Sequence, residues 1–202
     1  MGGGAETHDG FYLRFALGFG TLHMERKGEG QTDFGAFQGK SEIDGGVAVS
    51  EISVGGTPGG GFVVAGTFLS YRLPETTIKY ENGVEEELGG PLNMIVLGGG
   101  VDWYPSPTGG FHFGGLLGFA VAVGDAPSTS PFENIGGLGG ALSISVGYDW
   151  WIGDEWSIGV LGRATGAGVH GEATADTGAG EVTGKEDSSI SAFTVSLCGV
   201  YH

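Results

Sequence analysis

The sequence is poor in the residues that cross-link a small protein or give it a basic surface. Its 202 residues contain one cysteine, Cys198, so no disulfide can form within the chain. It has no run of about 18 apolar residues, which excludes a transmembrane helix. Only 8 residues are lysine or arginine, against 24 aspartates and glutamates, and the resulting net charge of −16 argues against nucleic-acid binding.

The first residues lack the basic and apolar regions of a signal peptide, and we expect a mature chain whose signal has been removed. Glycine, in contrast, is abundant, with 45 residues. Glycine at this level usually indicates disorder, but 40% of the residues are hydrophobic and 11% aromatic, which is too many for a disordered chain. Both facts agree if the glycines face a crowded barrel interior and form tight turns.

Residues 111–151 show the pattern most clearly. The first arm of this segment reads FHFGGLLGFAVAV, and the second contains ALSISVGYDWW. In both arms large apolar residues alternate with glycine, alanine, serine or a single charged residue. A period of two predicts strands with one large apolar face and one small or polar face. Each arm is long enough to cross a bilayer, so the pair resembles the wall of a transmembrane β-barrel.

The same alternation predicts eight strands. They cover residues 10–20, 46–55, 61–72, 92–104, 111–123, 138–150, 156–167 and 188–201. The facing of residues 61–72 stays open, since large apolar residues occupy both parities. Long polar segments (21–45, 73–91, 124–137 and 168–187) alternate with short turns. This pattern of strands and connections predicts an all-β fold. It is an eight-stranded antiparallel transmembrane up-and-down β-barrel with four long extracellular loops and three short periplasmic turns. Residues 1–9 form a lead, and residues 10–202 the barrel domain.

Aromatic residues gather where these strands meet short turns or chain ends. All four tryptophans belong to this group. We expect it to form a membrane-interface belt, because amphipathic rings favour the level of the lipid head groups. Its members are Phe11, Trp103, Tyr104, Phe111, Tyr148, Trp150, Trp151, Trp156 and Tyr201.

The hairpin quoted above and the closing segment SAFTVSLCGVYH resemble the small eight-stranded outer-membrane proteins of Gram-negative bacteria, the OmpA-like, OmpX-like and OmpW-like barrels. The glycine-rich strands are similar to barrels common in myxobacteria. The resemblance is one of architecture and covers about residues 10–202. It implies location in the outer membrane of a Gram-negative bacterium and contact with outer-membrane lipids and lipopolysaccharide. We expect a monomer with no nucleic-acid partner and an unidentified extracellular partner.

Six charged or titratable residues fall on the inward parity: Arg14, Glu51, Asp102, His112, Asp149 and Arg163. They predict a lumen charge cluster. Because buried charges must be paired, the first interpretation is a set of ion pairs that plugs a narrow lumen. A gate or a proton-sensitive site is the functional alternative, and the many inward glycines leave room for a narrow channel.

Acidic residues concentrate in the four polar segments, which hold 17 of the 24. They predict a solvated rim. Carboxylates can also bind divalent cations, and Glu75, Glu81 and residues 85–87 are candidates. No segment matches an ordered calcium-binding motif, so we expect neither a specific metal site nor a cofactor.

We therefore expect a non-enzymatic outer-membrane barrel with a structural or surface-interaction role through its acidic extracellular loops. One alternative is a narrow channel that passes small solutes or hydrophobic compounds. Another is a lipid A-modifying enzyme, for which His23, His170 and Ser70 are conceivable residues. A third is a soluble lipocalin-like barrel, which would need Phe113, Leu117 and Phe119 to point inward.

Overall fold

The structure is a computed structural model, and it describes residues 8, 10–32, 35–74, 76–87, 90–106, 108–125, 134–176 and 181–202. Within these ranges, the side chains of residues 30–32, 35–38, 134–135, 173–176 and 181–183 are not described. In this part of the chain all regular structure is β. No described helix is long and apolar enough to cross a membrane.

Ten strands are present in the described residues. They are β1 (Gly10–Thr32), β2 (Gly35–Gly59), β3 (Phe62–Leu73), β4 (Thr77–Tyr80), β5 (Glu85–Glu87), β6 (Leu92–Trp103), β7 (Phe111–Asp125), β8 (Asn134–Trp151), β9 (Trp156–Asp176) and β10 (Glu181–Tyr201).

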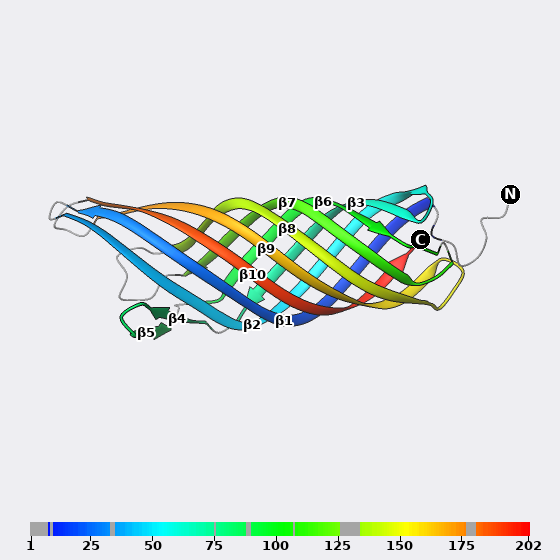
Figure 1. Cartoon of the computed structure of the whole chain (residues 1–202), viewed down its shortest axis with the longest axis horizontal. Helices are drawn as coiled ribbons and strands as arrows, with labels where there is room; N and C mark the ends of the chain where they lie inside the picture. Colours follow the sequence, from blue (N-terminus) through cyan, green and yellow to red (C-terminus); the bar gives the residue numbers. More distant parts are fainter. Residues whose placement is uncertain are drawn as a thin grey trace.

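Eight of these strands form a closed antiparallel barrel (Figure 1). Each strand pairs with its neighbour in the order β1-β10-β9-β8-β7-β6-β3-β2, and β1 also pairs with β2, which closes the sheet on itself. Closure leaves the barrel wall without an unpaired edge. The predicted fold, an eight-stranded antiparallel up-and-down barrel, is confirmed.

The polar segments differ from the expected loops. Residues 21–45 were expected to form one loop, but β1 and β2 stay paired as far as Thr32 and Gly35. Likewise, β9 and β10 stay paired as far as Asp176 and Glu181, inside the expected loop 168–187. A small β4–β5 hairpin lies within the second expected loop, 73–91, and pairs with β2. Strands β1, β2, β9 and β10 therefore continue beyond the barrel as a projecting sheet. We call this sheet, which lies within residues 21–45 and 168–187, the ribbon.

The two ends of the barrel are thus different (Figure 1). The ribbon projects from one end, the ribbon end. The start of β1 and the C-terminus lie at the opposite end, the termini end, together with the short connections β2–β3, β6–β7 and β8–β9. At the first of these connections Gly59, Gly60 and Gly61 have φ angles of 116°, 67° and 77°. Residues that carry a Cβ atom rarely adopt such positive φ angles, which explains the glycines of this turn.

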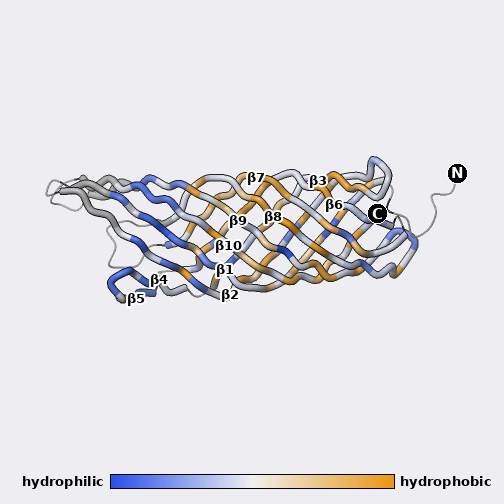
Figure 2. Tube along the Cα trace, in the orientation of Figure 1, coloured by the Kyte–Doolittle hydropathy of each residue, from blue (hydrophilic) through white to orange (hydrophobic). Residues whose placement is uncertain are grey.

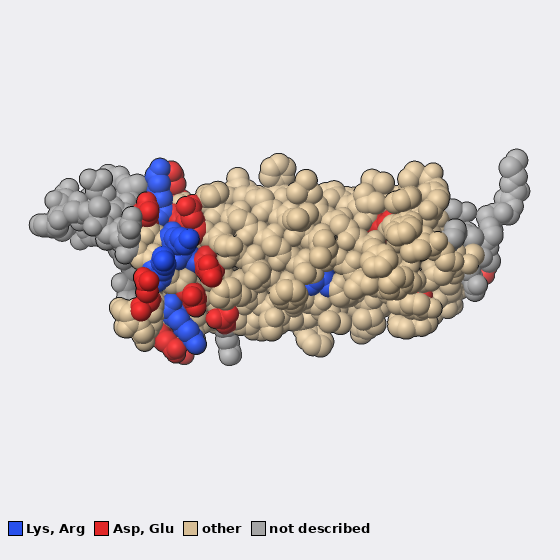
Figure 3. Space-filling model, viewed as in Figure 1, with Lys and Arg blue, Asp and Glu red and all other residues tan. Residues whose placement is uncertain are grey.

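The apolar side chains of the outward parity cover the barrel. Leu117 and Phe119 on β7 are 71% and 75% exposed, and Phe113 is 46% exposed. The lipocalin-like alternative required these three side chains to point inward and is therefore wrong. Figure 2 shows the apolar residues along the barrel wall and the hydrophilic residues toward the ribbon. In Figure 3 the wall shows few charged atoms, and a belt of lysine, arginine, aspartate and glutamate lies beyond it at the ribbon end.

The facing of β3, which the sequence left open, is now defined. Val63, Leu69 and Tyr71 are fully buried, and Phe62 and Phe68 are exposed. The interior can hold the large β3 side chains because other strands contribute small residues there, such as Ala141 on β8, Ala167 on β9 and Ala192 on β10, which belong to the same apolar cluster as Leu69 and Tyr71.

Glycine also allows close contact between neighbouring strands. A Cβ atom added at Gly98 on β6 would lie 2.3 Å from the carbonyl oxygen of Leu117 and 2.7 Å from the Cα of Gly118. At the adjacent, outward Gly99 an added Cβ would meet nothing within 4 Å. Inward glycine at Gly98 is therefore a steric requirement, whereas Gly99 has open space around it.

Candidate functional site

The interior contains all six residues of the expected lumen charge cluster. Each of them is at most 8% exposed. They come from six different strands: β1 carries Arg14, β2 Glu51, β6 Asp102, β7 His112, β8 Asp149 and β9 Arg163. The alternation of each strand turns them inward, and closure of the barrel brings them together.

Glu51 is the centre of this network. Its Oε1 atom lies 2.7 Å from Arg14 NH2 and accepts a hydrogen bond of 2.8 Å from Arg14 Nε. Its Oε2 atom lies 2.5 Å from Arg163 NH2. Arg14 also donates through NH1 to Asp102 Oδ2 at 2.9 Å. Two guanidinium groups and two carboxylates therefore cross the lumen as one continuous ion-pair network.

His112 occupies a different position in this cluster. Its Nδ1 atom lies 4.0 Å from Asp102 Oδ1, and its Nε2 atom lies 4.0 Å from Asp149 Oδ2. Both distances exceed a hydrogen bond, and neither ring nitrogen has a hydrogen-bond partner in the described structure. The imidazole therefore lies between two carboxylates without a direct bond to either.

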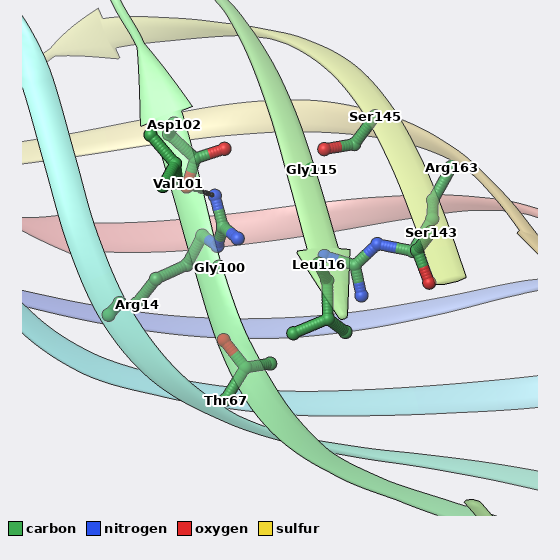
Figure 4. A pocket seen from close by; sticks show the side chains of 11 residues that line it. Arg14, Thr67, Gly100, Val101, Asp102, Gly115, Leu116, Ser143, Ser145 and Arg163 are labelled. Atoms are coloured by element: carbon green, nitrogen blue, oxygen red, sulfur yellow. Dashed lines mark hydrogen bonds and ion pairs between the residues drawn. The ribbon is translucent and has the colours of Figure 1, made fainter. Parts of the chain in front are cut away.

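A small cavity lies against the network. Arg14 and Arg163 extend into it from opposite sides, and Thr67, Asp102 and Ser145 also line it (Figure 4). Its volume is about 10 Å³, which is enough for about one water molecule. The Nε atom of Arg163 is buried and has no hydrogen-bond partner in the described structure. It would therefore donate a hydrogen bond to a water molecule in this cavity.

Tyr104 does not belong to the outer aromatic belt, and this part of the expectation is wrong. Its side chain is fully buried. The hydroxyl group donates to Asp149 Oδ2 at 2.8 Å, and the ring stacks on His112 with a centroid distance of 4.7 Å. The period of two assigns Tyr104 to the inward parity, next to the outward Trp103, so the sequence contained a signal for this position.

The other eight aromatic residues are at least partly accessible. Phe11, Trp103, Phe111, Tyr148, Trp150 and Trp156 are between 42% and 54% exposed. Tyr201 and Trp151 are half-buried. The Nε1 atom of Trp151 donates to the carbonyl oxygen of Thr108 at 3.2 Å, and the Trp151 ring packs on His8 and His202.

His8 and His202 close the lumen at the termini end, a contact that no pattern in the sequence predicts. Both are buried. His8 Nε2 lies 3.0 Å from the carbonyl oxygen of Gly109, so this nitrogen donates. His8 Nδ1 lies 3.0 Å from His202 Nδ1, and His202 Nε2 lies 3.1 Å from the hydroxyl oxygen of Ser157. The His8 ring also stacks on Tyr104 at 3.6 Å.

The pKa of both imidazoles reflects this closure. Burial lowers the pKa of His8. Burial, reinforced by the proximity of His8, lowers the pKa of His202 to about 3. With both histidines neutral, each ring offers one donor and one acceptor, which completes a chain of hydrogen bonds from Ser157 through both rings to Gly109. At neutral pH the closure is therefore uncharged.

The ribbon end of the lumen is apolar. Twenty buried residues form one cluster there, including Leu22, Met24, Ile43, Leu69 and Met94. Among the described residues, no group of three or more histidine, cysteine, aspartate or glutamate side chains is arranged to hold a metal ion. Of the acidic candidates for divalent cations, Glu75 lies outside the described residues.

The histidines named for a lipid-modifying activity lie on the outer surface. His23 Nδ1 lies 2.6 Å from Asp44 Oδ1, and His170 Nδ1 lies 2.6 Å from Asp187 Oδ1. Ser70 on β3 pairs with Ser50 and Ile95, and neither histidine is its cross-strand partner. The expected combination of these histidines with Ser70 is therefore not formed.

Comparison with known proteins gives a fold likeness. No family model matches the chain, and no curated protein matches it. The outer membrane protein OprG from Pseudomonas aeruginosa is similar over 98% of this chain and 99% of its own, with a TM-score of 0.59 and 12% sequence identity.

Two further structures are more distant. The outer membrane protease OmpT from Escherichia coli covers 94% of this chain and 97% of its own, at 8% identity and a TM-score of 0.45. Ail, the attachment invasion locus protein of Yersinia pestis, covers 94% of this chain and 99% of its own, at 9% identity and a TM-score of 0.38.

At 12% identity the likeness to OprG concerns the fold and not the activity. It agrees with the closed sheet, the apolar outer surface and the charged belt beyond it, and these features together support location in an outer membrane. The chain has the fold of an eight-stranded outer-membrane β-barrel.

Proposed function

We propose that this protein is an outer-membrane anchor that presents the acidic ribbon outside the cell, in a structural or surface-interaction role. The observation that carries the proposal is the contrast between the filled lumen and the projecting ribbon. From the termini end to the ribbon end the lumen contains the histidine closure, the ion-pair network and the apolar cluster in turn. In this proposal the interior serves to hold the wall together, and the function lies in the ribbon.

The ribbon, in contrast, presents many charged side chains to its surroundings. The outward side chains of its strands include Glu25, Lys27, Glu42, Glu172 and Lys185, all exposed. On the inner side Arg26 and Glu186 form a two-point ion pair between β1 and β10, which ties the ribbon strands together. A surface held in shape by such contacts can recognise a partner without paying the full ordering cost of a flexible loop.

In this proposal the ribbon end is extracellular, the termini end is periplasmic and the barrel is a monomer. Outer-membrane lipids and lipopolysaccharide surround the wall, and divalent cations bind diffusely at the acidic belt. The test compares the full chain with a variant in which residues 27–40 are replaced by a two-residue turn. Both should fold in detergent and show no steady conductance in planar bilayers. Only the full chain should change the electrophoretic mobility and aggregation of cells that express it.

Equal cell-surface properties for the two proteins would contradict the anchor role. Steady conductance of the full chain would favour a channel instead. One observation supports a second candidate, the passage of a hydrophobic compound: the lumen near the ribbon end is lined by apolar side chains. Uptake of an apolar dye by proteoliposomes, lost in a Leu69→Glu variant, would support this candidate.

A further inference from the structure

The two histidines of the closure face each other through the same ring atom. His8 Nδ1 and His202 Nδ1 are 3.0 Å apart, and both side chains are buried. Two histidine nitrogens that bind one metal ion at about 2.0–2.1 Å each lie about 2.9–3.4 Å apart when the angle at the metal is about 90–110°. The separation of the two Nδ1 atoms therefore fits a shared metal ion as well as a shared proton.

The second ring nitrogen of each histidine has a partner outside the pair. His8 Nε2 donates to the carbonyl oxygen of Gly109 at 3.0 Å, and His202 Nε2 lies 3.1 Å from the hydroxyl oxygen of Ser157. A histidine that binds a metal almost always donates its other ring N–H to an oxygen atom nearby, which fixes the tautomer and the orientation of the ring. Both rings therefore already have the outer contacts of a pair of metal ligands.

A change of tautomer at one ring converts the hydrogen bond into a pair of ligands. Without a metal, Ser157 donates to His202 Nε2, and His202 Nδ1 donates to His8 Nδ1. If the His202 proton moves from Nδ1 to Nε2, the Ser157 oxygen becomes the acceptor, and the lone pairs of both Nδ1 atoms become available. Neither ring gains or loses a proton overall, so both ligands stay neutral.

Aromatic rings hold the two imidazoles in place. The Tyr104 ring stacks on His8 with a centroid distance of 3.6 Å, and the Trp151 ring lies 5.0 Å from His8 and 4.8 Å from His202. His8 precedes β1 and His202 follows β10, so packing and not a shared strand sets their separation. Ligands that are held in place before a metal binds lose little conformational freedom on binding.

The interior next to the pair carries a net negative charge. Tyr104 connects this region to the pair, because its hydroxyl donates to Asp149 and its ring stacks on His8. In the described structure no arginine or lysine forms an ion pair with Asp149, which lies 4.0 Å from His112. With neutral histidines, the buried charged side chains of the described residues have a net charge of −1, and they are Arg14, Arg163, Glu51, Asp102 and Asp149. A cation at the histidine pair would compensate this charge.

We propose that His8 and His202 bind one copper(II) ion through their Nδ1 atoms. With bonds of about 2.05 Å, their separation gives an angle of about 94° at the metal. Copper(II) and nickel(II) favour such angles in square-planar or tetragonal sites, whereas zinc favours tetrahedral ones, and copper binds most strongly of the three. The remaining coordination positions are open to water. The ion fastens the residue before β1 to the residue after β10 and so joins distant parts of the chain at the termini end.

The site is independent of the surface-interaction role, because it lies at the end of the barrel opposite the ribbon. The sequence predicted no metal site, since 194 positions separate the two histidines and no binding motif contains them. Two other histidines, His23 and His170, lie near the outer surface, each 2.6 Å from a carboxylate oxygen, and could also bind copper. Both are therefore replaced by alanine in every protein of the test.

The experiment uses the full chain in this background, folded in detergent and freed of metal with a chelator. Copper(II) is titrated against a competing chelator, and pulsed electron paramagnetic resonance counts the imidazoles on the bound ion. We expect one tightly bound copper ion with two imidazoles. Ser157→Ala, which removes the outer partner of His202, should weaken binding by about 10–100-fold and keep both imidazoles. His8→Phe and His202→Phe should each weaken binding by more than about 100-fold and leave at most one imidazole, since a ligand is lost.

A shift in gel mobility on heating shows that each variant is folded. One copper ion bound through two imidazoles, with binding lost in His202→Phe, supports the site. Copper bound through fewer than two imidazoles in the parent protein overturns it, as does no binding or equal affinity of the parent protein and His202→Phe. The cell-surface measurements that test the anchor role do not involve copper, so the two proposals can fail separately.

Discussion

The Nδ1 atoms of His8 and His202 lie 3.0 Å apart, although 194 positions separate the two residues in the chain. This contact joins the two ends of the barrel sequence at the termini end. Ser157 and Gly109 complete the hydrogen-bond chain, and Tyr104 and Trp151 pack against the rings. The contact makes the closure sensitive to protons, because two protonated imidazoles cannot share one hydrogen bond.

Acid should therefore destabilise the folded protein. In the unfolded chain both imidazoles titrate near pH 6.5, whereas burial lowers the pKa of His8 and lowers that of His202 to about 3. The unfolded state thus binds more protons below pH 6.5, and the free energy of unfolding falls as the pH drops. At pH 5 the loss from His202 alone should be about 2 kcal/mol. Urea unfolding in detergent at pH 7 and pH 5 measures it.

The matched variant replaces both histidines by phenylalanine, which keeps a ring at each position and removes the titration. Its free energy of unfolding should change less between pH 7 and pH 5 than that of the parent protein. An identical pH dependence in both proteins would show that the closure does not carry the effect.

Loss of the Glu51 charge should be strongly destabilising. Glu51→Gln leaves Arg163 without its carboxylate partner and Arg14 with Asp102 alone. Removal of one member of a buried ion network costs about 3–5 kcal/mol, because the remaining charges stay buried. The midpoint of urea unfolding measures the change. Glu42→Gln, at an exposed position of the same strand, should shift the free energy by less than about 0.5 kcal/mol.

The two adjacent glycines of β6 should respond differently to the same substitution. Gly98→Ala places a Cβ 2.3 Å from the Leu117 carbonyl oxygen, whereas Gly99→Ala meets open space. We expect Gly98→Ala to cost about 1–3 kcal/mol, as overpacking does, and Gly99→Ala to be close to neutral. Equal destabilisation by both substitutions, measured by thermal mobility shift, would mean that close strand contact does not explain the inward glycine.

A charge on the apolar wall should be costly at the centre and tolerated at the rim. Leu117→Lys places an ammonium group on the exposed apolar face of β7, where a lipid-facing lysine costs about 2–4 kcal/mol. Thr21→Lys lies next to the charged belt and should cost at most about 1 kcal/mol. Refolding yield into lipid vesicles at increasing urea measures both. Equal yields for the two variants would argue against a lipid-facing wall.

Most of the barrel could be predicted from the sequence, because alternation reports directly on facing in a sheet. Ile52, Val54, Leu97 and Trp103 point outward as this rule required. The rule does not identify a strand where charged residues take the place of apolar ones on the outward face. In residues 21–45 the outward positions carry His23, Glu25 and Asp44, so the continuation of β1 and β2 resembles a loop. The inward Leu22, Met24 and Ile43 were the signal that the strands continue.

The cross-strand groupings could not be predicted in the same way. The contact between His8 and His202 depends on where two distant ends of the chain meet, and a period of two does not give that information. The ion pair of Arg26 with Glu186 depends on the register of β1 with β10. A one-residue shift in this strand pair would move one of the two side chains to the opposite face.

Spin labels at neighbouring positions of β7 distinguish the lipid-facing wall from the filled lumen. Single cysteines replace Phe119 and Ala120 in a Cys198→Ala background, and the labelled proteins are folded into lipid vesicles. Phe119 is 75% exposed on the wall, and Ala120 is buried in the lumen. In a membrane barrel with a filled lumen, the label at position 119 should collide with oxygen dissolved in the lipid and not with a water-soluble nickel complex, while the label at position 120 should be protected from both. Frequent collision of the label at position 119 with the nickel complex would contradict a membrane barrel, and frequent collision at position 120 would contradict a filled lumen.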